Sequence, residues 1–143
     1  MENVSRREKA VALHAEGYNC AQSVVLAFED LLPAERDTLA GISSSFGGGI
    51  GGMREVCGAV SGMAMVLGFL YGSPVPGDKA AKADHNARIQ SLTGEFRERI
   101  GDIICRRLLG LEAVPGQALN KKPCAEYVGD AAEILEKYIS SHS

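Results

Sequence analysis

Apolar residues recur at spacings of three and four along nearly the whole chain, which is the pattern of helices that bury one face. Gly17, Pro33 and the run 72–77 interrupt this pattern and mark helix ends. Alternating apolar and polar runs of strand length are missing. The pattern therefore predicts an all-α fold, a compact single-domain bundle of six or seven helices, with helices over residues 3–16, 20–32, 33–44, 55–71, 78–99, 102–110 and 123–138.

The segment 55–71 is apolar on almost every side, which predicts a buried helix at the centre of the bundle. Gly58 and Gly62 lie four residues apart on one face of this helix and would let a neighbouring backbone come close. Small residues on this helix also permit a homodimer.

The segment 46–53 just before this helix is the most glycine-rich part of the chain and is predicted to be a loop. It spells Gly-x-Gly-x-x-Gly over 47–52, but a dinucleotide fingerprint also needs a preceding strand and an acidic residue about 20 positions later. Two interpretations remain open. The loop is a flexible connector, or its backbone amides approach a functional site and donate hydrogen bonds to sulfur or to an anion.

Length and composition indicate one globular domain, residues 1–143, with an ordinary apolar fraction of 45%. The net charge of −3 and the absence of Trp argue against nucleic acid or an anionic membrane surface as a partner. The N-terminus does not resemble a secretory signal, and no apolar run reaches the roughly 20 residues of a membrane span. We expect a soluble cytoplasmic protein without membrane insertion.

Four widely spaced cysteines, Cys20, Cys57, Cys105 and Cys124, each fall at or near the start of a predicted helix. Unpaired N–H groups and the helix dipole at such a position favour the thiolate over the thiol. In the cytoplasm free thiols are the default, so these residues indicate metal or redox chemistry more than structural disulfides. No Cys-x-x-Cys pair is present, so the spacing does not indicate a zinc finger or a thioredoxin-type site.

Three functions fit four such cysteines if folding brings them together. The thiolates could bind an iron–sulfur cluster or another thiophilic metal. Without metal, the same residues could act as a thiol–disulfide oxidoreductase or redox sensor, with three possible pairings. In the third case each cysteine is a small buried residue in a helical interaction module. Backbone at Gly49, Gly52 and Gly58 is expected to lie near a bound cofactor, and the redox partner is not indicated by the sequence.

Three further polar residues have simpler interpretations. His85 lies on an apolar helix face and is expected to be hydrogen-bonded structure rather than a ligand. His14 is expected at the surface. Arg54, three residues before Cys57, could lower a thiol pKa but is expected to be a solvated charge.

The run Cys57-Gly58-Ala59-Val60-Ser61-Gly62 resembles the central motif of the C-GCAxxG-C-C family of redox-active proteins. Cys20 in the run 18–23, Cys105 in the run 96–110 and Cys124 in the run 124–128 look like the first, third and fourth cysteines of that family. The resemblance covers nearly the whole chain and implies a redox or metal role for the four cysteines. Part of the family is similar to a split-Soret cytochrome, but this chain lacks the Cys-x-x-Cys-His sequence of covalent haem attachment.

Overall fold

The computed structural model describes residues 4–119 and 121–142 and contains seven α-helices within them. The prediction of an all-α fold is confirmed, since the described residues form no sheet and only one isolated β-bridge, between Val56 and Ile104. Two short 3₁₀ helices, η1 (Glu29–Leu31) and η2 (Ser44–Phe46), flank the third helix. The α-helices are α1 (Arg6–Ala15), α2 (Cys20–Leu26), α3 (Arg36–Ser43), α4 (Gly58–Tyr71), α5 (Lys79–Ile100), α6 (Cys105–Leu108) and α7 (Cys124–Ser141).

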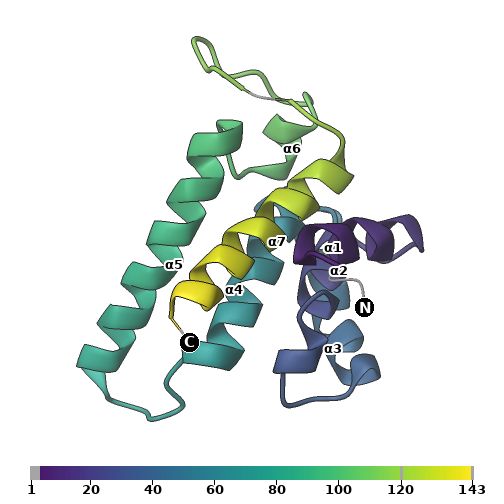
Figure 1. Cartoon of the computed structure of the whole chain (residues 1–143). Helices are drawn as coiled ribbons and strands as arrows, with labels where there is room; N and C mark the ends of the chain where they lie inside the picture. Colours follow the sequence, from purple (N-terminus) through teal and green to yellow (C-terminus); the bar gives the residue numbers. More distant parts are fainter. Residues whose placement is uncertain (1–3, 120, 143) are drawn as a thin grey trace.

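The long helices α4, α5 and α7 lie side by side, and α1, α2 and α3 cover the flank away from α5 (Figure 1). The short helix α6 lies at one end of this bundle, and the turn between α4 and α5 lies at the other (Figure 1). The main packing pairs are α1 with α7 and α2 with α4. None of the helices in the described ranges combines the length and the hydropathy that a bilayer span requires.

The apolar faces that the sequence predicts meet in one core. Phe28, Met63, Phe96 and Tyr127 come from different segments and are each almost fully buried there. The prediction of a buried helix over 55–71 is correct for the face that carries Met63, although Phe69 on the same helix is 39% exposed.

Several predicted helix boundaries are wrong. The third helix begins at Arg36 rather than at residue 33, and the sixth covers Cys105–Leu108 rather than 102–110. Two further differences have a visible cause. The central helix begins at Gly58 rather than at residue 55, because Val56 pairs with Ile104 in the β-bridge. The second helix ends at Leu26 rather than near residue 32, since the chain continues through η1 instead. The β-bridge at Val56 and the 3₁₀ turn at Glu29–Leu31 use backbone hydrogen bonds that differ from those of an α-helix, although the apolar pattern continues through both segments.

Helices α2 and α4 approach each other closely at two glycines of α4. A Cβ atom at Gly58 would lie 3.0 Å from the Phe46 carbonyl oxygen and 3.1 Å from the Cβ of Cys20. A Cβ atom at Gly62 would lie 2.8 Å from the carbonyl oxygen of Ala21. These two glycines therefore allow a short distance between α2, which begins at Cys20, and α4, which begins directly after Cys57.

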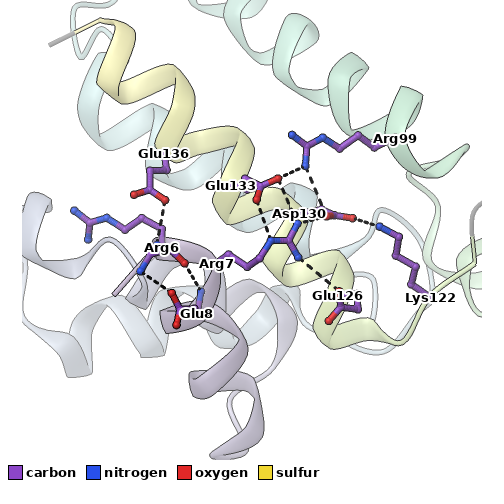
Figure 2. A network of polar contacts seen from close by, with 10 residues as sticks. Arg6, Arg7, Glu8, Arg99, Lys122, Glu126, Asp130, Glu133 and Glu136 are labelled. Atoms are coloured by element: carbon purple, nitrogen blue, oxygen red, sulfur yellow. Dashed lines mark hydrogen bonds and ion pairs between the residues drawn. The ribbon is translucent and has the colours of Figure 1, made fainter. Parts of the chain in front are cut away.

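Buried charge joins α1 and α5 to α7. The carboxylate of Asp130, with 3% of its side chain exposed, pairs with Arg7, with Arg99 at 3.7 Å and with Lys122 at 2.9 Å (Figure 2). Glu133, one turn further along α7, also accepts from Arg7 and Arg99. A nearly buried carboxylate is stable only when it is paired in this way, so the network fixes α7 between its neighbours.

Candidate functional site

All four cysteines line one cavity of about 250 Å³. The other lining side chains include His14, Arg54 and Tyr127, and the glycine backbone contributes at Gly48, Gly49 and Gly58. Residues separated by as many as 104 positions (20 to 124) are thus brought to one place. This convergence is the geometric requirement for any chemistry that uses the four thiols together.

Each of the four cysteines stands at the start of a helix. Cys20, Cys105 and Cys124 are the first residues of α2, α6 and α7, and Cys57 is the N-cap of α4. The local sequence explains two of these starts. Asn19 caps α2 by accepting from the N–H of Gln22, and Pro123, which precedes Cys124, is the N-cap of α7.

Cys57 and Cys105 form what we call the inner pair. The β-bridge places their backbones together, because the Cys57 N–H donates to the Ile103 carbonyl at 2.7 Å and the Cys105 N–H donates to the Glu55 carbonyl at 2.6 Å. Both side chains are buried, with 5% and 9% of the residue exposed. Upstream, the carboxylate of Asp102 accepts from the N–H groups of Ile103 and Ile104, which orders the turn that leads into Cys105.

Cys20 and Cys124 form the outer pair, and both are half-buried free thiols. A hydrogen bond between the two side chains raises the pKa of Cys20, and burial and the neighbouring sulfurs raise it further. The same hydrogen bond lowers the pKa of Cys124, and the positive charge of Arg54 adds to that effect against the opposing effect of burial. The pair is therefore polarised, with Cys20 holding a proton and Cys124 close to the thiolate form.

The expectation that a helix start favours thiolate at every cysteine is wrong for the metal-free protein. Burial raises the pKa of Cys57 to about 12, although the backbone N–H groups of Ala59 and Val60 act in the opposite direction. Burial therefore destabilises the Cys57 thiolate more than the hydrogen bonds at the helix start stabilise it. A group that supplies positive charge inside the cavity would reverse this balance, since metal-bound thiols are deprotonated.

The glycine-rich segment is an ordered loop against the cavity, not a flexible connector. Its residues from Gly48 to Gly52 all have positive φ, and successive turns are closed by bonds such as Arg54 N–H to the Gly48 carbonyl and Glu55 N–H to the Gly49 carbonyl, both 2.9 Å. A Cβ atom at Gly49 would lie 2.6 Å from the Glu55 nitrogen, so this position requires glycine. Of the glycines expected near a cofactor, Gly49 and Gly58 line the cavity, whereas Gly52 is exposed and lies outside it.

Two polar residues that were expected at the surface also line the cavity: His14, which is partly buried, and Arg54, which is exposed as expected. Nη1 of Arg54 lies 3.9 Å from Sγ of Cys105, and Nε2 of His14 lies 3.9 Å from Sγ of Cys20. The sequence signal that could have placed Arg54 at the cavity is its position three residues before Cys57. No local pattern marks His14, which reaches the cavity because the chain reverses at Gly17 before Cys20.

His85 is remote from this cavity. It lines a separate hollow with the 73–79 segment, and its Nδ1 lies 2.8 Å from Nη1 of Arg88. Its hydrogen-bonded environment agrees with the structural role expected from the sequence.

The donor set suits a thiophilic group, but its spacing is not that of a single ion. Within the described ranges no three His, Cys, Asp or Glu side chains are close enough to hold one metal ion. A tetrahedral zinc site with Zn–S distances near 2.3 Å requires sulfurs about 4 Å apart. An iron–sulfur cluster distributes its thiolates over more than one iron, so it does not require all four sulfurs to reach a single ion.

Comparison with known proteins agrees with the arrangement of cysteines. Residues 18–138 match the sequence model of the family described as "Putative redox-active protein (C_GCAxxG_C_C)". No curated protein and no solved structure matches the chain. The match includes all four cysteines and most of the chain, so this protein belongs to the C-GCAxxG-C-C family of redox-active proteins.

Proposed function

We propose that the protein carries electrons through an iron–sulfur cluster held by Cys20, Cys57, Cys105 and Cys124. The observation that supports this proposal is the convergence of the four thiols on one cavity. Thiolates are the ligands that iron–sulfur clusters use, and a bound cluster would supply a one-electron couple. An external redox protein or small molecule would exchange the electron.

The dimensions of the cavity support a compact cofactor. Pockets that enclose drug-sized molecules measure roughly 300–1,000 Å³, and this cavity measures about 250 Å³. It is too small to enclose a haem, a flavin or a dinucleotide. The mostly apolar wall, which includes Leu108, Leu109 and Tyr127, would shield a cluster from water.

Each half of the site contributes in a different way. The β-bridge holds the inner pair in place before any cofactor binds, whereas the outer pair comes from the first residues of two different helices, α2 and α7. The backbone N–H groups of Ala59 and Val60 at the start of α4 donate to the sulfur of Cys57. Preorganised donors of this kind stabilise the added negative charge of a reduced cluster.

The test is to isolate the protein without oxygen and measure iron and acid-labile sulfide per chain, together with the visible absorption and the electron paramagnetic resonance of the reduced sample. We expect stoichiometric iron and sulfide in the native protein and their loss in each of the four Cys→Ser variants. Far-ultraviolet circular dichroism must show that each variant remains helical. A colourless native protein that binds no iron after anaerobic reconstitution would rule out the cluster.

The polarised outer pair supports a second candidate, a metal-free thiol–disulfide exchange. The Cys124 thiolate would attack one sulfur of a disulfide substrate, forming a mixed disulfide and releasing the first thiolate of that substrate. Cys20 would then lose its proton and attack Sγ of Cys124, closing a disulfide and releasing the second thiol. The substrate gains two electrons and the protein loses two, so a reversible loss of two free thiols per chain, confined to the outer pair, is the expected signature.

A further inference from the structure

Arg54 differs from the other cations at this end of the molecule in what it faces. Arg106 and Arg107 both donate to the carboxylate of Glu112, and each has a second carboxylate partner in Glu55 or Asp102. For Arg54, no carboxylate of the described chain lies within ion-pair distance. Its guanidinium instead lies on the cavity wall against Sγ of Cys105.

The backbone holds Arg54 in this position. Its φ of 63° is in the left-handed region, which a residue with a Cβ atom rarely adopts. Its N–H donates to the Gly48 carbonyl at 2.9 Å, and its carbonyl accepts from the Arg106 N–H at 3.1 Å. Glycine would adopt this conformation without strain, as four glycines of the preceding loop do, whereas Arg54 adds a charged side chain to the cavity wall.

The surroundings make the charge effective. Arg54 is exposed to solvent as a residue, but it also lines the mainly apolar cavity, where its charge is screened less than it would be in open solvent. Besides the thiols, His14 and the phenol of Tyr127 are the remaining titratable groups on this wall. The hydroxyl of Tyr127 is occupied by the Lys122 N–H and the Leu108 carbonyl, so it does not neutralise the guanidinium.

We propose that Arg54 is a positioning charge that makes the cavity select negative groups. It draws anionic small molecules to the thiols in preference to neutral ones of the same reactivity, and it stabilises the more negative state of a bound cofactor. The second statement rests on the proposed iron–sulfur function, and the first does not.

The test of the first statement uses the metal-free, reduced protein and two alkylating reagents, iodoacetate and iodoacetamide. Both reagents consume the thiolate, so the ratio of their rates at one cysteine cancels the thiolate fraction and reports the local charge. We expect the Arg54→Gln variant to lower the iodoacetate-to-iodoacetamide ratio at Cys124 and Cys105 about fivefold at low salt. Arg54→Lys, which keeps the charge, should restore most of the ratio.

Two further variants separate charge from shape. Arg107→Gln removes a cation that pairs with Glu112 and Asp102 outside the cavity, and it should leave the ratio unchanged. Arg54→Gly removes the charge and also the backbone strain, so it should give the same low ratio as Arg54→Gln. If Arg54→Gln leaves the ratio at its native value, or slows both reagents equally, the proposal is overturned.

The test of the second statement is the reduction potential of the iron-loaded protein. Arg54→Gln should shift the one-electron reduction equilibrium about tenfold toward the oxidised form, equivalent to about 59 mV, and Arg107→Gln should not. An unchanged potential in Arg54→Gln would contradict this statement. If the protein binds no cluster at all, the proposed function fails, while the alkylation ratio still tests the charge of Arg54.

Discussion

The inner and outer cysteine pairs lie on one cavity but are held there by different forces. Two backbone hydrogen bonds across a β-bridge fix Cys57 and Cys105, and both side chains are almost fully buried. Cys20 and Cys124 depend on the positions of whole helices, remain half-exposed, and interact through their side chains. The inner pair is thus a rigid base, and the outer pair is the accessible, reactive half.

This difference explains how one site could serve two chemistries. A cofactor that uses all four sulfurs must recruit the inner pair, in which the Cys57 thiol resists ionisation in the metal-free protein because burial raises its pKa. A disulfide exchange needs only the outer pair. The following predictions separate the two pairs, beginning with the largest effect.

The reactivity of the two pairs toward iodoacetamide should differ most. Because Cys124 has a lowered pKa and Cys57 has a raised pKa of about 12, we expect Cys124 of the metal-free protein to be alkylated at least a thousandfold faster at pH 7. The rate at Cys124 should fall only as the pH drops well below the ordinary cysteine pKa of about 8.5. Mass spectrometry of timed samples measures both rates, and denatured protein, in which all four cysteines should react alike, is the control. Equal rates at Cys57 and Cys124 in the folded protein would remove the distinction between the pairs.

Adding a methyl group at the contact between α2 and α4 should push apart the helices that position Cys20 and Cys57. Gly62→Ala places a Cβ atom 2.8 Å from the Ala21 carbonyl oxygen, so we expect a loss of about 1–3 kcal/mol in the free energy of unfolding. Urea denaturation measures this change. Gly68→Ala on the same helix is the matched control, because no atom lies within 4 Å of its added Cβ, and it should stabilise the protein by about 0.5–1 kcal/mol. A Gly62→Ala variant as stable as Gly68→Ala would show that the helices are not in close contact.

Removing the charge of Asp102 should weaken the support of the inner pair in a pH-dependent way. Burial alone would raise the pKa of Asp102, but the hydrogen bonds from Gln117 and from the backbone of Ile104 and Ile103 lower it below its usual value. A carboxylate with a depressed pKa stabilises the fold above its unfolded pKa near 4, and this contribution disappears as the pH falls through the folded pKa.

We therefore expect Asp102→Asn to cost about 1–2 kcal/mol at pH 7 and almost nothing near pH 2. Denaturant unfolding at a series of pH values measures the difference from the native protein. Glu98→Gln, on the exposed side of α5, should change stability by less than about 0.5 kcal/mol at every pH. A constant difference between Asp102→Asn and the native protein across this range would assign the effect to shape rather than to charge.

The sequence predicted the outer pair better than the inner pair. The Asn19 cap before Cys20 and Pro123 before Cys124 are local signals, and both helices begin where these signals place them. The position of Cys57 depends on a β-bridge between segments 48 residues apart (56 and 104), which no local pattern encodes. For the same reason the start of α4 was predicted three residues too early. His14 and Arg54 became cavity residues only through tertiary packing.

The central claim is that the four sulfurs form one centre. The most direct measurement counts the thiols that anaerobic loading with iron and sulfide protects from alkylation, cysteine by cysteine, with the metal-free protein alongside. The account predicts that all four cysteines become protected together and are released together when a chelator removes the iron. Protection of the outer pair alone, or of no cysteine, would contradict it.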